Sequence, residues 1–559
     1  MPSFKTLACL SLGLLALTCG PAARAASSDP ARPNILLIVA DDLGFADLGS
    51  FGSEIATPNL DSLAAAGIRL TNFQAMPACS PTRAALLTGV DPHLAGLGNM
   101  AEELAPNQVG KPGYEGHLNE RVVTVASLLR DAGYHTYLSG KWHLGNTDST
   151  GPDDRGFERS FSLLSGGASH FADMKPAYAP TPDAKAPYAR DGRPLARLPE
   201  NFHYSSQFYA DQVIDYLKAD QNDGRPFFAM LAFTAPHWPL QAPDAALAKY
   251  RGRYQAGFDA LFQQRLDKQK ALGLIPADAE GAERAPRGRP WSSLSPRERE
   301  REARAMETYA AMVDELDFNT GRVLDYLKAQ GVYDNTVVLF ISDNGAEGHD
   351  LDETWPAALF PEIRKVVDET HDFSFEQMGR PGSYTFLGPD WARASAPAFK
   401  LHKGFASEGG TRTVGILRIP SMHGEGGLLH ELVSVKDFAP TLLELAGVAP
   451  PGRRYQGRVV EPMSGLSILP LLQGATNPER SLGGELFGKY FIRQGDWKLV
   501  HMPRPWGNDD WQLYNLATDL AERHDLSRSE PDKRAELQEL WRRYAADNGV
   551  ILPDQVSGY

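Results

Sequence analysis

Apolar and polar positions form blocks along the chain that predict strands and helices in turn. Ile35–Ala40 is an uninterrupted apolar run, typical of a strand buried on both faces of a parallel sheet. Similar runs predict strands at or near Thr136–Ser139, Phe227–Phe233, Val337–Ile341 and Leu417–Pro420. Apolar residues spaced by three and four predict helices at Val122–Ala132, Ala303–Ala329 and Val435–Ala446. This alternation indicates an α/β fold with a large, mostly parallel central sheet.

Three stretches depart from the alternation. Residues 255–302 are charged, and we interpret them as a helical insertion on the surface. Residues 350–400 are rich in loops and are expected to border a substrate opening. From residue 480, short apolar runs predict antiparallel strands, at Phe487–Ile492, Trp497–Met502 and Gln512–Asn515, before a closing helix at Leu537–Tyr544. We therefore predict a main domain over residues 26–479 and a small C-terminal α+β subdomain with an antiparallel sheet over residues 480–559.

Residues 1–25 have the pattern of a signal peptide. Lys5 supplies a positive charge, Leu7–Leu17 is apolar, and Ala23-Arg24-Ala25 is a small-x-small cleavage site. The apolar run is too short to span a bilayer, and no later run reaches about 18 apolar residues. We expect an exported protein, periplasmic or secreted, without stable membrane insertion.

Composition narrows the function. The formal net charge is −14 and no basic tract occurs, which argues against a nucleic acid partner. Two of the three cysteines lie in the predicted signal, so Cys79 would be the lone thiol of the mature chain. A single cysteine in an exported protein is unusual. Cys79 is either a buried, inert residue or one that takes part in the chemistry of the protein, and the residues next to it favour the second interpretation.

Two predicted strands end in carboxylates. Ile35–Ala40 leads into Asp41 and Asp42, and Val337–Ile341 leads, after one serine, into Asp343. The carboxyl ends of parallel strands meet at one edge of a sheet, and two carboxylates about 4 Å apart there repel by roughly 4 kcal/mol. Each aspartate alone could be a cap or turn residue. Together they predict an all-oxygen cation site, which favours Ca²⁺ or Mg²⁺ over zinc.

The lone thiol belongs to the string Cys79-Ser80-Pro81-Thr82-Arg83. Pro81 suits the first turn of a helix, which would continue through Leu87. Cys79 would then lie at the helix N-terminus, where amide groups and the helix dipole favour an anion. Arg83 would lie one turn further along the same face.

This string, with Leu87-Thr88-Gly89 after it, resembles the signature of the type I sulfatases, whose cysteine a maturation enzyme converts to formylglycine. Other motifs follow the family's order: Asp41-Asp42, Gly140-Lys141-Trp142-His143-Leu144-Gly145, Pro236-His237, Asp343-Asn344-Gly345, and Lys403 with Glu408-Gly409-Gly410. The resemblance extends from about residue 32 to the C-terminus and is strongest toward bacterial arylsulfatases.

The resemblance implies an alkaline-phosphatase-like fold and one Ca²⁺, with Mg²⁺ as the alternative. The metal ligands it implies are Asp41, Asp42, Asp343, Asn344 and an oxygen of the modified Cys79. A formylglycine-generating enzyme would be the maturation partner. The main domain would then be the catalytic sulfatase domain.

It also implies roles for the polar side chains. A hydroxyl of the hydrated aldehyde (3-oxoalanine) at Cys79 attacks sulfur, Asp343 takes its proton and Arg83 stabilises the nucleophile. The second hydroxyl then releases sulfate, a route closed to plain serine or cysteine. The side chains that handle sulfate and protons would be as follows: Lys141 and Lys403 hold sulfate oxygens, His237 or Lys403 protonates the leaving alcohol, and His143 assists sulfate release.

Hydrolysis of aryl or alkyl sulfate monoesters is the function that this resemblance implies. Phosphonate and phosphodiester hydrolases of the same superfamily can carry the cysteine signature, and the motifs do not specify the organic part of the substrate. A binding protein that captures sulfated ligands without catalysis would keep Cys79 as a thiol. A thiol enzyme is a further alternative, which we expect the acidic cluster to disfavour by raising the thiol pKa.

Overall fold

The computed structural model describes residue 1 and residues 32–555, except 148, 178–180, 355–356, 359, 421 and 423–425. Apart from Met1, the predicted signal peptide lies outside the described residues, so export stays a prediction. Among the helices of the described part, none is both long and apolar enough to cross a membrane.

A ten-stranded sheet runs through the molecule in the order β12-β2-β11-β9-β1-β8-β4-β5-β6-β7. Its middle strands are parallel: β9 (Thr336–Ser342), β1 (Asn34–Ala40), β8 (Phe227–Ala232), β4 (His135–Lys141) and β5 (Arg159–Leu163). The outer strands pair mostly antiparallel: β12 (Gly427–Leu429), β2 (Ile68–Leu70), β11 (Gly415–Arg418), β6 (Tyr188–Arg190) and β7 (Arg193–Pro194). The mostly parallel central sheet predicted from the apolar runs is confirmed.

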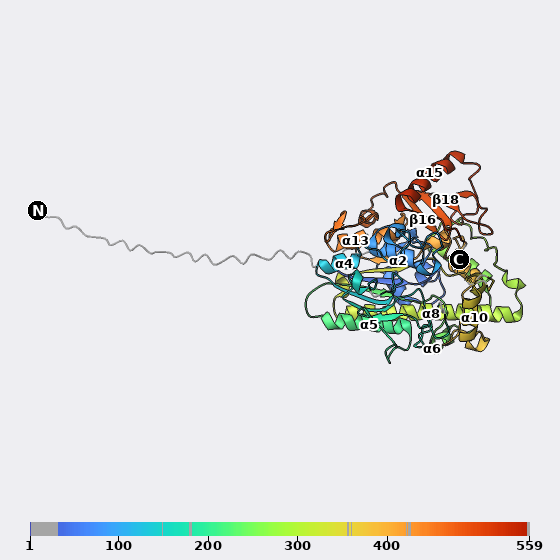
Figure 1. The fold of residues 1–559 in the computed structure, drawn as a ribbon, viewed down its shortest axis with the longest axis horizontal. Helices are drawn as coiled ribbons and strands as arrows, with labels where there is room; N and C mark the ends of the chain where they lie inside the picture. The colour runs from blue at the N-terminus through green and yellow to red at the C-terminus, as the bar shows by residue number, and fades with distance from the viewer. Residues whose placement is uncertain are drawn as a thin grey trace. The chain divides into compact units, whose positions relative to one another are not determined.

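Helices cover both faces of this sheet. Alternate side chains of β1 face two separate apolar cores, one on each side. Leu36 and Ile38 face one apolar core, whereas Ile35, Leu37 and Val39 face a second core. The first core is closed by α1 (Pro58–Ala65), α5 (Ser205–Asp220), α6 (Asp244–Tyr250) and α8 (Pro296–Ala329). The second is closed by α2 (Cys79–Thr88), α4 (Val125–Asp131) and α13 (Phe438–Leu445) (Figure 1).

The charged segment 255–302 is not confined to the surface. Its helix α7 (Phe258–Ala271) carries Arg265, which is fully buried and pairs with Asp47 at 2.6 Å and with Glu54 at 2.9 Å. The end of the segment is already the first turn of α8, where a capping box starts the helix. The surface interpretation is therefore wrong for this part, because the paired carboxylates that allow an arginine to be buried lie far away in the sequence.

Four antiparallel strands form the predicted C-terminal sheet: β16 (Ser481–Leu486), β17 (Lys489–Gln494), β18 (Trp497–His501) and β19 (Trp511–Asn515). Helix α15 (Pro531–Asn548) packs against it. Phe487 and Gly488, both with positive φ, form the β16–β17 turn. The predicted strand from Phe487 therefore begins two residues too early, because an aromatic residue is uncommon in a turn of this kind.

Helix α12 (Glu408–Thr411) anchors this small sheet. Glu408 is fully buried and accepts hydrogen bonds from Lys498 of β18 at 2.8 Å and from Gln74 at 2.9 Å. Its backbone N–H donates to Glu522 at 2.8 Å. The Glu408-Gly409-Gly410 motif therefore has a structural role. It joins the segment that contains Lys403 to the C-terminal strands.

A buried histidine makes a second link to the C-terminal sheet. His93, in α3 (Pro92–Ala95), lies 2.9 Å from Asp91 through Nδ1 and 3.3 Å from Glu485 of β16 through Nε2. Burial alone would lower its pKa, but the two carboxylates raise the pKa of His93 from 6.5 to about 9. Because the folded pKa exceeds the unfolded one, this stabilisation is complete below pH 6.5 and is lost as the pH rises through about 9.

We predict that this group makes the free energy of unfolding fall by about 3 kcal/mol over that window, at about 1.4 kcal/mol per pKa unit. Urea unfolding at several pH values checks this. His93→Asn should flatten the decline, and the exposed control His203→Asn should not. If the free energy of unfolding had the same pH dependence in both variants, the decline could not be assigned to His93.

Candidate active site

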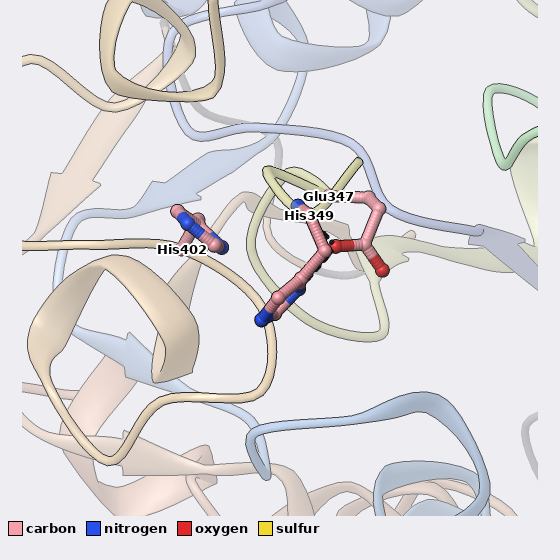
Figure 2. A group of neighbouring side chains, drawn as sticks. All are labelled: Glu347, His349 and His402. Atoms are coloured by element: carbon pink, nitrogen blue, oxygen red, sulfur yellow. Dashed lines mark hydrogen bonds and ion pairs between the residues drawn. The ribbon is translucent and has the colours of Figure 1, made fainter. Parts of the chain in front are cut away.

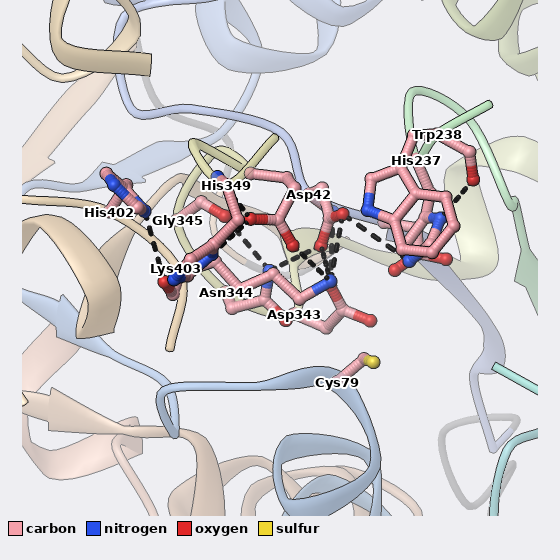
Figure 3. A network of polar contacts seen from close by, with 12 residues as sticks. Asp42, Cys79, His237, Trp238, Asp343, Asn344, Gly345, His349, His402 and Lys403 are labelled. Atoms are coloured by element: carbon pink, nitrogen blue, oxygen red, sulfur yellow. Dashed lines mark hydrogen bonds and ion pairs between the residues drawn. The ribbon is translucent and has the colours of Figure 1, made fainter. Parts of the chain in front are cut away.

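The predicted site residues meet at the carboxyl edge of four adjacent parallel strands. The register pairs Val39 of β1 with Ala232 of β8 and Ile341 of β9, and pairs Ala232 with Gly140 of β4. The residues that follow these positions come together there: Asp41, Asp42, Lys141, His143, His237, Asp343 and Asn344. One buried group at this edge contains Glu347, His349 and His402 (Figure 2), and a neighbouring group surrounds Asp42 and Asp343 (Figure 3).

Cys79 is the first residue of α2, as the sequence predicts, and the helix ends before Gly89. The side chain of Cys79 is 2% exposed, and its Sγ lies 3.3 Å from His143 Nδ1. Arg83, one turn along the helix, donates from Nε to Asp343 Oδ2 at 2.8 Å and from Nη1 to the Lys141 carbonyl at 2.9 Å. The helix therefore delivers the thiol and a buried cation to the same edge of the sheet.

Each of the three carboxylates has a cationic partner. Lys141 Nζ lies 2.7 Å from Asp41 Oδ2, and Lys403 Nζ lies 3.0 Å from Asp42 Oδ2. The third pair is that of Arg83 and Asp343, described above. All six side chains are at most 1% exposed. Removal of either member of such a pair would leave an uncompensated buried charge.

The oxygen atoms of this group fit a hard cation. Burial raises the pKa of Asp42 to about 7, with Lys403 opposing the shift and Glu347 and Asp343 adding to it. Asp41 is raised well above its usual pKa, again mainly by burial. Asn344 Oδ1 is buried without a hydrogen-bond partner among the described residues. Carboxylate and amide oxygens are the ligands that Ca²⁺ and Mg²⁺ take.

Glu102 is a site residue that the sequence did not reveal. Its carboxylate lies 2.9 Å from His143 Nε2, on the side of the ring opposite Cys79. Burial alone would lower the pKa of His143, but Glu102 and Cys79 raise it to about 9. Glu102 lies in no recognisable motif, so the contact depends on the path of the chain.

The thiol environment differs from the expectation. Burial raises the pKa of Cys79, but Lys141, His143 and Lys403 lower it to about 6. The prediction that nearby acids would raise this pKa is wrong, because each carboxylate is paired with a cation and the net field at sulfur is positive. This ground for rejecting a thiol enzyme therefore fails.

His237 stands at the other side of the site. Its Nε2 lies 3.6 Å from Asp42 Oδ2, and its Nδ1 lies 2.5 Å from the Trp238 carbonyl, so the Nδ1 hydrogen is donated there. Burial, then Lys403 and Lys141, hold the pKa of His237 well below its ordinary value. The ring is accordingly neutral. Lys400, which precedes Lys403 in the chain, donates instead to the Glu522 carbonyl at 3.2 Å.

Two glycines shape the space between the imidazoles. A Cβ on Gly166 would lie 2.8 Å from the His143 ring, and a Cβ on Gly167 would lie 3.1 Å from the His237 ring. A pocket of about 250 Å³ opens beside His143, with Glu102 and Gly166 in its lining. Any larger residue at these positions would displace a histidine.

The backbone is strained at two of the site residues. Asp42 and His143 have φ of 65° and 56°, in the left-handed region that residues other than glycine seldom adopt. Such strain is concentrated at functional sites, where the surrounding structure enforces it. Here it directs both side chains into the cluster.

These features define a class of protein: an α/β protein of alkaline-phosphatase-like fold, with a buried thiol at a helix N-terminus among paired cations and carboxylates. The sulfatase family model matches residues 33–448. The chain belongs to the sulfatase family, and it is an enzyme that hydrolyses sulfate esters.

Three relatives illustrate the similarity. An uncharacterized sulfatase of Schizosaccharomyces pombe is 45% identical, over 94% of this chain and 95% of that protein. The arylsulfatase of Klebsiella aerogenes is 38% identical, over 78% of this chain and 91% of that one. The crystal structure of Ps i-CgsB in complex with k-i-k-neocarrahexaose has a TM-score of 0.64 and 25% identity, covering 94% of this chain and 95% of that chain.

Proposed function

We propose that this sulfatase hydrolyses aryl or alkyl sulfate monoesters with Cys79 converted to formylglycine and with Ca²⁺ or Mg²⁺ beside it. The observation that carries the proposal is the position of Cys79 at the start of α2, 3.3 Å from His143 and at the same sheet edge as the buried pairs of Arg83, Lys141 and Lys403. The similarity to the Klebsiella arylsulfatase supports an aryl leaving group.

The modified residue would supply a hydrated aldehyde, with one hydroxyl to attack sulfur and a second to permit sulfate to leave. Asp343 is suited to accept the proton of the attacking hydroxyl, and Arg83 keeps that carboxylate in place at 2.8 Å. His143, oriented by Glu102, lies against position 79 and suits the proton transfer that accompanies sulfate release.

Lys141 and Lys403 would hold the sulfate oxygens, because their ammonium groups are buried and converge on the site. Of the two proton donors that the sequence offered, Lys403 suits the leaving alcohol better. The neutral ring of His237 has no proton to spare, since its Nδ1 hydrogen is already donated to Trp238. His237 then presents only its Nε2 lone pair to the site, which can accept a hydrogen bond from the hydroxyl of the product alcohol.

Asp41, Asp42, Asp343 and Asn344 would hold the cation, together with an oxygen of modified Cys79. A cation there supplies charge stabilisation at the sulfate group. We also propose an exported enzyme whose maturation partner is a formylglycine-generating enzyme.

Mass spectrometry of the Cys79 peptide, together with assays of sulfate release, tests the function. We expect the peptide to show the mass loss that converts a thiol to an aldehyde, in proportion to sulfate released from a chromogenic aryl sulfate. Matching phosphonate and phosphodiester substrates should turn over far more slowly. An unmodified Cys79 in the native host would overturn the proposal, and faster turnover of the phosphorus esters would assign the site to them.

Chelation should destabilise the protein. A cation present at 100 times its dissociation constant stabilises the folded state by about 2.7 kcal/mol. We therefore expect the melting temperature to fall on treatment with a chelator and to recover with Ca²⁺ in a metal-free buffer. Asn344→Ala should need more Ca²⁺ for the same recovery, since it removes the unpaired Oδ1. A melting temperature independent of chelator and Ca²⁺ would exclude the site.

A further inference from the structure

Three buried side chains outside the proposed catalytic set gather next to Lys403. Glu347 and His349 follow β9, and His402 comes from the segment before α12. They are 3%, 1% and 4% exposed, and one donor atom of each lies within 4.8 Å of the others (Figure 2). Two imidazoles and one carboxylate are therefore assembled from distant parts of the chain.

Packing holds both rings in place. His349 Nδ1 lies 2.6 Å from Glu347 Oε1. The His349 ring stacks on Phe405, at 5.5 Å between centroids, and the His402 ring meets Phe405 edge-on at 5.0 Å. A Cβ on Gly348 would lie 2.4 Å from the His402 ring, so glycine leaves the room that this ring occupies.

The donors have the chemistry of a transition-metal site. His402 Nδ1 lies 3.2 Å from the Lys403 carbonyl, to which it donates, so Nε2 keeps a lone pair for a metal ion. Two imidazoles and a carboxylate suit Zn²⁺, whereas Ca²⁺ takes oxygen ligands. Donors on one zinc ion lie about 3.3 Å apart, so small side-chain rotations would close separations of up to 4.8 Å.

We propose that Glu347, His349 and His402 form a second metal site, selective for Zn²⁺-class ions and distinct from the hard-cation site at Asp41, Asp42 and Asp343. The site has a direct connection to Lys403, whose Nζ lies 3.2 Å from Glu347 Oε2. An ion on Glu347 competes with Lys403 for this carboxylate. We therefore expect bound zinc to inhibit turnover. This inhibition rests on the proposed function, but the binding of zinc does not rest on it.

The positive charge of Lys403 repels a divalent cation, and this repulsion limits the affinity of the site for zinc. We expect zinc to bind in the micromolar range rather than as tightly as in closed structural sites. The site would then respond to the concentration of free zinc instead of being permanently filled.

Binding of Zn²⁺ to the purified chain, with Ca²⁺ in excess, tests the proposal. Isothermal calorimetry and equilibrium dialysis should show one zinc ion per chain, and Co²⁺ should give the intense visible bands of a low-coordinate site. His349→Asn and His402→Gln keep polar groups at these positions, and each should weaken zinc binding at least about tenfold. His203→Gln, an exposed histidine, should bind as the unaltered chain does.

Absence of zinc binding, binding that Ca²⁺ displaces competitively, or unchanged affinity in both histidine variants would overturn the site. Melting temperatures identify a variant that fails to fold, in which case the other variant decides. Zinc should also inhibit sulfate release, and His402→Gln should shift that inhibition to higher zinc. If zinc binds as expected and no sulfate is released at any zinc concentration, the metal site stands and the proposed function fails.

Discussion

Cys79→Ala is expected to lower the rate of sulfate release at least about 10⁴-fold, since removing a covalent nucleophile costs that much or more in other hydrolases. The cavity left by removal of the sulfur atom is small, so we expect this variant to lose roughly 1 kcal/mol or less in the free energy of unfolding. Turnover of a chromogenic aryl sulfate and urea unfolding of the same preparations measure both effects.

Ser80→Ala is the matched control. Ser80 neighbours Cys79 in α2, and its buried Oγ has no hydrogen-bond partner among the described residues. We expect its turnover to stay within about twofold, as for substitutions that remove no interaction. If Cys79→Ala retained activity comparable to this control, position 79 would not be the nucleophile.

Arg83→Met is expected to lower the free energy of unfolding by about 3–5 kcal/mol, because it leaves Asp343 charged and buried without its partner. Both side chains are 0% exposed, and the pair is 2.8 Å apart. Denaturant unfolding in a metal-free buffer measures the loss, because a cation bound at Asp343 would itself compensate that carboxylate.

An exposed ion pair provides the comparison for this variant. Arg121 pairs with Glu115 at 3.4 Å, with 38% and 29% of the side chains exposed. Arg121→Met should cost about 1 kcal/mol or less, as exposed pairs do. If Arg83→Met and Arg121→Met lost similar amounts of unfolding free energy, breaking the buried Arg83 pair would be no more destabilising than breaking the Arg121 pair, and the prediction would be wrong.

The residues at the ends of strands were predictable because local sequence determines both the strand and the residue after it. An apolar run such as Ile35–Ala40 has no alternative to burial, and the polar residue after it must then lie at the sheet edge. Asp41 and Asp343 could be placed together on this basis. The start of α2 at Cys79 was predictable for a similar reason, since Pro81 suits the first turn of a helix.

Contacts between distant loops could not be predicted. Glu102 reaches His143 across 41 residues, and His402 meets Glu347 and His349 through a fold of the chain with no local signal. The thiol pKa was also mispredicted. Counting acids in the sequence ignores Lys141, Lys403 and His143, whose distances from the sulfur atom exist only in the folded chain.

The sequence by itself therefore determined the family, the alternation of strands and helices in the main domain, and the motifs that meet at the carboxyl edge of the sheet. These properties depend on neighbouring residues and on the period of side chains along a strand or helix. The tertiary structure decided which charge faces which: Lys141 with Asp41, Lys403 with Asp42 and Glu347, and Arg83 with Asp343. Electrostatic energies depend on distance and burial. Both quantities are set when segments hundreds of residues apart pack together.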